Sequence, residues 1–267
     1  MTDKSIQEND YYDPGENRAN RVRDLFDRIA RRYDLINDVQ SGGLHRWWKR
    51  TVIKEAGDLQ NKTALDICCG TGDLSFALAA RGAETTGLDF SSEMLSQARD
   101  KILGKQPEAG TVLPEFQQGD ASELPYKNDT FDVVTMAYGL RNLKDWKLGL
   151  AEMHRVTRPG GRMLILDFGK PPNPWWRSMY FNYLKLIVPV MGWSLVGDAE
   201  AYRYILTSLQ HFPAQRGIEA AMIRLNCRHV RTRLFLGGVM SLNVGVKQEI
   251  TIPFANQSPA DRGDCRH

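Results

Sequence analysis

Apolar side chains in this chain follow two spacings, one typical of helices and the other of short buried strands. The first helical pattern runs from Asn20 to Tyr33, where apolar residues recur at every third or fourth position and arginines occupy the outer face. Further helices are expected at 44–56, 74–80 and 145–156, and one that begins near Ser91. Short apolar runs predict strands at 64–67, 85–88, 115–117, 131–137 and 162–168.

The segment 63–73 predicts a strand, a glycine turn and the start of a helix, which together form the first βα unit of a nucleotide-binding sheet. Gly70 and Gly72 allow the backbone to approach a ligand closely, because they carry no Cβ. Asp89 ends the second strand, where a carboxylate can accept hydrogen bonds from both ribose hydroxyls of an adenosine. The alternative is a tight turn that binds no ligand.

Both NAD and S-adenosylmethionine place a ribose at the end of this second strand. Two features favour S-adenosylmethionine. Asp66 lies inside the first strand, before the glycine turn. Asp120 and Ala121 follow the third strand, where these two residues can contact an adenine. A dehydrogenase turn would more often carry a third glycine, and here that position is not glycine. S-adenosylmethionine is therefore the favoured ligand, and an NAD-dependent dehydrogenase is the alternative.

The two N-terminal helices, within residues 20–56, have two interpretations. They can form a lid over the first turn, with Tyr33 and His45 facing the ligand. Such a lid would exclude water, which favours methyl transfer from a sulfonium. The alternative is a helix pair that packs its aromatic side chains on the sheet.

The loop after the strand 131–137 carries Tyr138-Gly139-Leu140-Arg141-Asn142. Ligands of open α/β sheets bind beyond the carboxyl ends of the strands, so this loop is expected to border the substrate. The alternative is that Arg141 and Asn142 only cap the next helix. That helix is expected to end before the turn signal at Arg158-Pro159-Gly160-Gly161.

Composition limits the remaining possibilities. The chain has 267 residues, 42% of them hydrophobic, with a net charge of +3, which predicts a soluble globular protein with one full core. It has no basic run with interleaved aromatic residues, so no nucleic-acid partner is expected. Its four cysteines lack metal-ligand spacing, which indicates a reducing compartment and no metal. The polar first residues resemble neither a signal nor a transit peptide, so a cytoplasmic location is expected.

Residues 171–196 are rich in aromatic and aliphatic side chains, but Lys185 and Pro189 interrupt them. The apolar run is shorter than the roughly 20 residues that a membrane-spanning helix needs. One interpretation is a helix that packs on the sheet, and the other is an apolar binding surface in contact with the membrane interface.

Several segments together resemble the ubiquinone/menaquinone biosynthesis C-methyltransferase family of class I S-adenosylmethionine-dependent methyltransferases. The similarity extends from about Arg21 to Lys247. The segments that carry it are 33–37, 41–48, 138–142, 155–169, 201–213 and 237–247. The sequence departs from the family at Gln40, Ala137, Asp167, Gly169 and Leu242-Asn243; Asp167 replaces the usual Glu, and Ala137 a serine that often lines the donor site.

This resemblance implies a seven-stranded, mostly parallel sheet with helices on both faces, ending in strands near 232–236 and 239–246, the last of them antiparallel. It implies one methyltransferase domain over 20–248, with lid helices at 20–56 and a substrate-side insertion at 171–215. Residues 1–19 are expected to be a mobile arm, and the tail 249–267 has no assigned role.

The implied reaction is C-methylation of a prenylated quinol, demethylmenaquinol or the benzoquinol intermediate of ubiquinone synthesis. The implied donor contacts fall on Thr71, Asp89, Asp120 and Ala121, beside Ala137. Arg141 is expected to stabilise the phenolate form of the ring, because a guanidinium stays charged and donates from a fixed fork. Asn142 and Tyr33 are expected to orient the ring oxygen or a water, and His45 is the other candidate base.

The implied partner is the prenylated quinol, reached by peripheral contact with the inner face of the membrane. A non-catalytic lipid-binding module is a further alternative, which predicts no methyl transfer. The sequence leaves the oligomeric state open, with a homo-oligomer among the alternatives.

Overall fold

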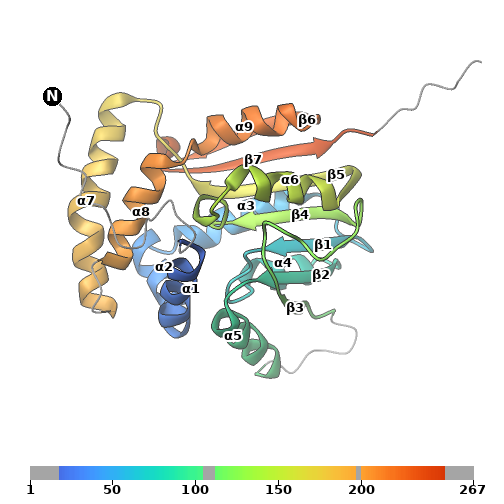
Figure 1. Cartoon of the computed structure of the whole chain (residues 1–267), viewed down its shortest axis with the longest axis horizontal. Helices are drawn as coiled ribbons and strands as arrows, with labels where there is room; N and C mark the ends of the chain where they lie inside the picture. Colours follow the sequence, from blue (N-terminus) through green and yellow to red (C-terminus); the bar gives the residue numbers. More distant parts are fainter. Residues whose placement is uncertain (1–17, 105–111, 197–199, 250–267) are drawn as a thin grey trace, which may run out of the picture.

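The computed structural model describes residues 18–104, 112–196 and 200–249, and the side chains of residues 18, 19, 21 and 191–205 are outside that description (Figure 1). The expected arm over 1–19 and the tail over 249–267 therefore lie almost wholly outside the described residues. No helix in the described ranges is long and apolar enough to cross a membrane. Cys68, Cys69 and Cys227 are free thiols.

A seven-stranded sheet forms the centre of the described part of the chain, in the order β3-β2-β1-β4-β5-β7-β6. Strands β1 to β5 pair in parallel, and β7 lies antiparallel to both β5 and β6. This confirms the expected fold. The strands are β1 Thr63–Ile67, β2 Glu84–Asp89, β3 Glu115–Gln118, β4 Phe131–Ala137, β5 Thr157–Phe168, β6 Cys227–Phe235 and β7 Met240–Lys247.

Two strands are longer than the apolar pattern predicts. β5 begins at Thr157, and the expected turn at 158–161 is an irregularity within it, where the register against β4 shifts and Gly160 takes φ +78°. β6 begins at Cys227 rather than near Thr232, and Arg228 already pairs with Val246 of β7. Most of β6 is exposed at the edge of the sheet, so its polar side chains hide the strand from a search for apolar runs.

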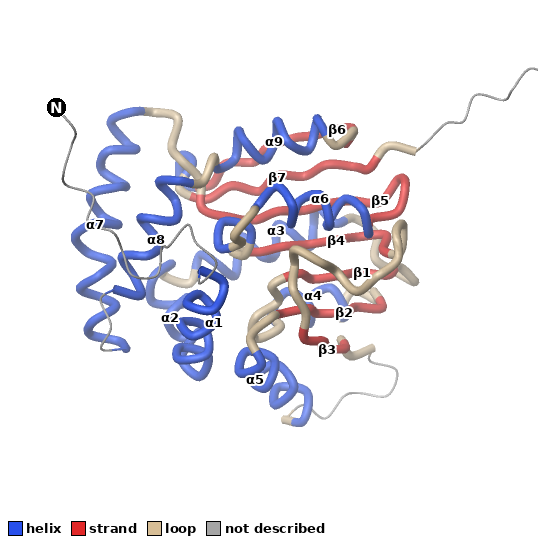
Figure 2. Tube along the Cα trace, in the orientation of Figure 1, coloured by secondary structure: helices blue, strands red, loops and turns tan. Residues whose placement is uncertain are grey.

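Helices cover both faces of the sheet (Figure 2). On one face, α6 and α9 pack on apolar side chains such as Leu65 and Ile67, while α3 and α4 pack on the opposite face over Ala64. α5 lies along β2 and β3. The helix bounds are α3 Leu44–Ala56, α4 Asp73–Ala79, α5 Ser92–Leu103, α6 Trp146–Val156 and α9 Ala214–Arg224.

A third apolar cluster lies outside the sheet layers and joins α1, α2, α7 and α8. Its members include Leu25 of α1, Ile36 of α2, Leu184 of α7 and Leu209 of α8. These helices gather beyond the carboxyl ends of the parallel strands, at the left of Figure 1. Their bounds are α1 Arg18–Ile29, α2 Tyr33–Ser41, α7 Pro174–Val196 and α8 Glu200–His211.

Candidate active site

Two cavities adjoin at the carboxyl ends of the parallel strands. The first, here the strand cavity, has a volume of about 450 Å³ and is lined by the ends of β2 and β4 and the segment after β3. The second, here the helix cavity, has a volume of about 610 Å³ and is lined mainly by α1, α2, α3 and α7. Phe26, Tyr33 and Tyr138 line both cavities, so the two spaces meet at these rings.

Asp89 lies at the end of β2 and faces the strand cavity. Its Oδ2 accepts a hydrogen bond from the backbone N–H of Gly70 (2.8 Å), and its Oδ1 accepts one from Ser91 (2.9 Å). These bonds fix the carboxylate and leave further lone pairs for a ligand's hydroxyl groups. Burial raises the pKa of Asp89 above its usual value.

The other side of the strand cavity is built by the segment after β3 and by the end of β4. Asp120 accepts a hydrogen bond from the Ser122 N–H (2.7 Å), and Ala121 is buried beside it. Ala137 ends β4 and completes this wall. Apolar side chains surround the carboxylates, including Leu88, Phe90, Met94, Leu143 and Leu148. A flat aromatic group with a polar edge fits such a lining.

Three of the expected donor residues do not line either cavity: Asp66, Thr71 and Gly72. Asp66 is fully buried and accepts hydrogen bonds from Ser75 Oγ (2.7 Å) and Thr135 Oγ1 (2.8 Å). Its burial raises its pKa to about 6. Gly72 has φ +83°, and a Cβ there would lie 2.6 Å from a ring atom of Phe116. Asp66 and Gly72 thus stabilise the turn without lining a cavity.

Thr71 connects the turn to the N-terminal helices. Its hydroxyl donates to Asp34 Oδ1 of α2 at 2.7 Å, and Asp34 Oδ2 lies 2.7 Å from Lys101 Nζ of α5. Ser91 likewise bonds Asp27 of α1. Polar contacts therefore hold α1 and α2 against the loops that border the strand cavity.

Tyr33 and Tyr138 stand where the cavities meet. Tyr33 begins α2, and burial raises its pKa to about 12. Tyr138 follows β4 with φ +62°, which is rare for a residue with a bulky side chain. Its buried hydroxyl has no hydrogen-bond partner in the structure. The sequence motif that contains Tyr138 predicted no role for this residue, although its place at the end of a central strand was a signal.

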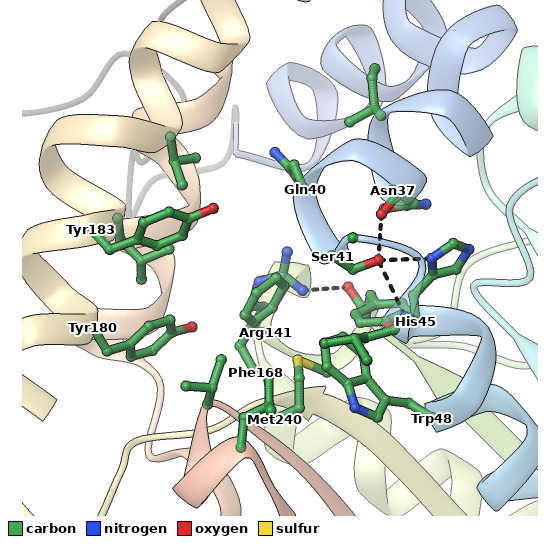
Figure 3. A pocket seen from close by; sticks show the side chains of 18 of the residues that line it. Asn37, Gln40, Ser41, His45, Trp48, Arg141, Phe168, Tyr180, Tyr183 and Met240 are labelled. Carbon is green, nitrogen blue, oxygen red and sulfur yellow. Dashed lines mark hydrogen bonds between the residues drawn. The ribbon is translucent and has the colours of Figure 1, made fainter. Parts of the chain in front are cut away.

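Arg141 is buried and lines the helix cavity (Figure 3). Its Nη1 donates to Asp167 Oδ1 (2.9 Å) and to the Tyr138 carbonyl (2.7 Å), and its guanidinium lies 4.6 Å from the Phe168 ring centre. The Arg141 backbone N–H also donates to Asp167 Oδ2 (3.2 Å). Asp167, a fully buried residue of β5, was missed as a site residue. A carboxylate inside an apolar strand was the available signal.

Asn142, next in the chain, lines the strand cavity instead. Its Nδ2 donates to the same Tyr138 carbonyl (3.0 Å), and its buried Oδ1 has no hydrogen-bond partner. The alternative role as a helix cap is wrong for both residues, because the Asp145 side chain caps α6 by accepting from Lys147 N and Leu148 N. Arg141 thus lines the helix cavity, and Asn142 lines the strand cavity.

His45 lies in the first turn of α3 and is almost fully buried. Its Nδ1 is 2.9 Å from Ser41 Oγ and 3.8 Å from Asp38 Oδ1. Burial and the nearby Lys49 charge lower its pKa, so the ring is neutral at pH 7. Figure 3 shows His45 beside Ser41, on the side of the cavity opposite Tyr180 and Tyr183.

The helix cavity is mostly apolar but holds several polar atoms. Among the described residues that line it, buried polar atoms without a hydrogen-bond partner in the structure include Gln40 Nε2, Trp48 Nε1, Tyr138 OH and Tyr180 OH. Such atoms are costly unless a ligand or water satisfies them. Within the described ranges, no group of three or more His, Cys, Asp or Glu side chains could hold a metal ion.

Comparisons with known proteins show the family to which the chain belongs. The model of the ubiE/COQ5 methyltransferase family matches residues 15–247. The ubiquinone/menaquinone biosynthesis C-methyltransferase UbiE of Ectopseudomonas mendocina is 39% identical over 88% of this chain and 91% of that protein. The demethylmenaquinone methyltransferase of Desulfitobacterium hafniense is 37% identical over 87% of this chain and 92% of that protein.

Among solved structures, the magnesium protoporphyrin IX methyltransferase (ChlM) of Synechocystis PCC 6803, with bound SAH, superposes with a TM-score of 0.60. The match covers 85% of this chain and 98% of that one at 19% identity, which supports the fold alone. The expected S-adenosylmethionine-dependent C-methyltransferase of quinone biosynthesis is confirmed, and the names of the relatives include both quinones. The chain belongs to the ubiE/COQ5 methyltransferase family.

Proposed function

We propose that this protein transfers a methyl group from S-adenosylmethionine to a ring carbon of demethylmenaquinol, giving menaquinol. The observation that carries the proposal is the meeting of two unlike cavities at Tyr33 and Tyr138. One cavity presents carboxylates at strand ends, and the other is apolar and built from helices. A water-soluble donor and a prenylated acceptor would each fit one of them.

S-adenosylmethionine would occupy the strand cavity, and its sulfonium supplies the electrophilic methyl group. Asp89 would accept the ribose hydroxyls, since its carboxylate is already oriented by the Gly70 and Ser91 N–H groups. Asp120 and Ala121 would lie against the adenine. Asp66, Thr71 and Gly72 would act indirectly by fixing the turn. Asn142 lines the same cavity, and its Oδ1, which has no hydrogen-bond partner in the structure, would offer an acceptor to the donor's amino group.

The quinol ring would lie in the helix cavity beside Arg141, near the boundary with the strand cavity. An aromatic carbon is a poor nucleophile, but the carbon ortho to a phenolate is a good one. A phenol has a pKa of about 10, so the site must favour its anion. The Arg141 guanidinium would stabilise that charge, because Asp167 and Phe168 already hold it in place.

Tyr33 would orient the ring oxygen or the water that takes the displaced ring proton. Its own pKa of about 12 keeps the phenol protonated, so it acts as a hydrogen-bond donor at neutral pH. His45 is the second candidate for the proton acceptor. It is neutral and buried in the cavity wall, but Ser41 engages its Nδ1.

The prenyl tail would extend through the apolar part of the helix cavity, between α7 and the N-terminal helices. In this arrangement residues 20–248 form the methyltransferase domain, 20–56 close over the donor, and 171–215 hold the acceptor. The enzyme would act as a peripheral protein at the inner face of the membrane, because its acceptor resides there. The benzoquinol of ubiquinone synthesis is the second candidate, supported by a relative named for both quinones.

Mass spectrometry of quinones in a bacterial host lacking its own C-methyltransferase tests the proposal. Expression of this gene should convert accumulated demethylmenaquinone into menaquinone. Restoration of ubiquinone alone would show that the methyl acceptor is the benzoquinol intermediate instead of demethylmenaquinol. Restoration of neither quinone, with the protein present in the cell extract, would contradict the proposed reaction.

A further inference from the structure

Tyr180 is a tyrosine of α7 whose buried hydroxyl has no hydrogen-bond partner in the structure. The residue lines the helix cavity and is only 5% exposed. Burial of a hydroxyl without a partner is destabilising, because the group loses its hydrogen bonds to water and gains none in return. A ligand in the cavity that completes this hydrogen bond would account for the tyrosine at this position.

Tyr180 lies near Arg141, although the two residues belong to distant parts of the chain. Figure 3 shows the Tyr180 hydroxyl pointing from α7 toward the part of the cavity that holds Arg141. Phe168 is a neighbour of both, since its ring centre lies 4.6 Å from the Arg141 guanidinium and its ring packs against the apolar cluster that contains Tyr180. Burial raises the pKa of Tyr180 and the Arg141 charge opposes that rise, so the hydroxyl stays protonated at neutral pH.

The proposed acceptor carries two ring oxygens on opposite sides of its ring. The first lies beside the open carbon that receives the methyl group, and the second lies beside the carbon that bears the prenyl tail. Only the first activates the open carbon, because a phenolate makes its ortho carbon nucleophilic and the second oxygen is meta to that carbon. The benzoquinol shares this arrangement. The site must therefore distinguish two similar hydroxyl groups.

The position of each oxygen follows from the place of Arg141. If Arg141 holds the first oxygen near the boundary with the strand cavity, the second oxygen points away from that boundary. The tail leaves the ring beside the second oxygen and would extend along α7. The second oxygen therefore needs a polar group on α7 that lines the helix cavity alone. Tyr180 meets both conditions, whereas Tyr138 lines both cavities and lies at their boundary.

Gln40 and Trp48 are the competing groups in the same cavity. Each lines the helix cavity alone and has a buried nitrogen without a hydrogen-bond partner in the structure. They belong to α2 and α3, across the cavity from α7. Their nitrogens can only donate, whereas a tyrosine hydroxyl both donates and accepts. A hydroquinone oxygen also does both, so Tyr180 matches it better.

We propose that the Tyr180 hydroxyl binds the second ring oxygen of the acceptor, beside the prenyl-bearing carbon, and thereby fixes which oxygen meets Arg141. This inference rests on the proposed function, because it takes a prenylated hydroquinone as the acceptor. Tyr180 then selects hydroquinones over monophenols, since a site built to bind a hydroxyl rejects an analogue that lacks it.

Calorimetry tests the contact without methyl transfer, with S-adenosylhomocysteine in place of the methyl donor. The first ligand is short-tailed demethylmenaquinol, kept reduced. The second is the matching prenylated naphthol, which keeps the hydroxyl beside the open carbon and lacks the other. Tyr180→Phe should bind the hydroquinone about three- to tenfold more weakly than the wild type does, the effect of losing one hydrogen bond. The two proteins should bind the naphthol equally.

Tyr126→Phe is the matched control, because the Tyr126 hydroxyl donates to Gln117 Oε1 (3.0 Å) and the residue lines neither cavity. It should bind both ligands as the wild type does. Equal weakening of both ligands by Tyr180→Phe, or weakening of neither, would overturn the proposal. A loss confined to the hydroquinone in Gln40→Met, with none in Tyr180→Phe, would also overturn it and assign the second oxygen to Gln40.

Thermal unfolding without ligand provides a readout that a structural role of the hydroxyl would move in the opposite direction. Tyr180→Phe should melt at or above the wild-type temperature, because it removes a buried hydroxyl that has no partner in the protein. A clear fall in the melting temperature would show that the hydroxyl stabilises the fold, and would overturn the proposal.

Turnover separates this inference from the proposed function. Tyr180→Phe should raise the KM for the hydroquinone more than it lowers kcat, with donor affinity unchanged. A wild type that binds the hydroquinone through Tyr180 but transfers no methyl group would keep the contact and refute the proposed reaction. Methylation by both proteins with the same KM would keep the reaction and refute the contact. Absence of hydroquinone binding by the wild type would overturn both.

Discussion

Arg141 depends on one buried carboxylate. Its side chain and backbone both donate to Asp167, and the two side chains are 6% and 0% exposed. We expect Asp167→Asn to lower the free energy of unfolding by about 3–5 kcal/mol, because it leaves a buried guanidinium without its counter-charge. Urea denaturation measures this. The partly exposed pair Arg158–Asp132 provides the control, and Arg158→Gln should cost under about 1 kcal/mol. Equal effects of the two substitutions would contradict the assignment.

Asp66 gives stability an unusual pH dependence. Its folded pKa of about 6 exceeds its usual value of 3.8, because burial disfavours the charge. A raised pKa means that the folded state holds its proton more tightly than the unfolded chain does. The contribution of Asp66 is therefore fully present below about pH 4 and is lost as pH rises through 6.

We expect the wild type to gain about 1 kcal/mol relative to Asp66→Asn when pH falls from 7 to 5. The comparison between the two proteins cancels the opposing effect of buried His45 and half-buried His154, whose lowered pKa values destabilise the fold on acidification. Unfolding free energies at both pH values provide the measurement. A constant difference between the proteins would show that Asp66 is not a buried, titrating group.

Among single residues, the sequence predicts well which side chains at strand ends line the strand cavity. Asp89, Asp120, Ala121 and Ala137 all line one cavity, because strand ends can be read from apolar runs. It could not separate them from Asp66, whose side chain points to the α4 face of the sheet. Asp167 was identified only as a departure from the family and received no role in the site, since its partner Arg141 is distant in sequence.

Among elements, the N-terminal helices are joined to the donor turn by few polar contacts. Asp34 of α2 accepts from Thr71 Oγ1 and pairs with Lys101, which also pairs with Asp73. We expect Thr71→Val to speed dissociation of S-adenosylmethionine about tenfold, the effect of losing one hydrogen bond to a charged group. Stopped-flow measurement of release tests this.

Thr130→Val is the matched control, because its hydroxyl donates to Lys127 O in an exposed turn away from both cavities. It should release the donor at the wild-type rate. If Thr71→Val also behaves as the wild type, the helices do not restrain the donor through this contact.

The limits of sequence reasoning also appear at the level of elements. Apolar runs located β1, β2 and β4 closely, since these central strands are buried on both faces. The edge strand β6 alternates exposed arginines with partly buried residues, and its start was placed too late. The apolar pattern of α7 could not show which face is buried, because that depends on where α1, α2 and α8 pack.

For the whole molecule, two different parts of the fold build the two adjoining cavities. The parallel sheet supplies the strand cavity, whereas the N-terminal helices α1, α2 and α3 and the distant helix α7 build most of the helix cavity (Figure 1). The fold class and the donor half of the site follow from local patterns. The acceptor half does not, because it arises only when residues 25–48 meet residues 176–188 and 236–240 in space.

The central claim is that methyl donor and quinol meet beside Arg141, and methyl transfer by this variant tests it most directly. Purified protein is given methyl-labelled S-adenosylmethionine and demethylmenaquinol, below its melting temperature, and calorimetry measures donor affinity. We expect Arg141→Ala to lower turnover by about 10²–10³ with donor affinity nearly unchanged, and Arg141→Lys to recover only part of the rate. A folded Arg141→Ala protein with wild-type turnover would contradict the account.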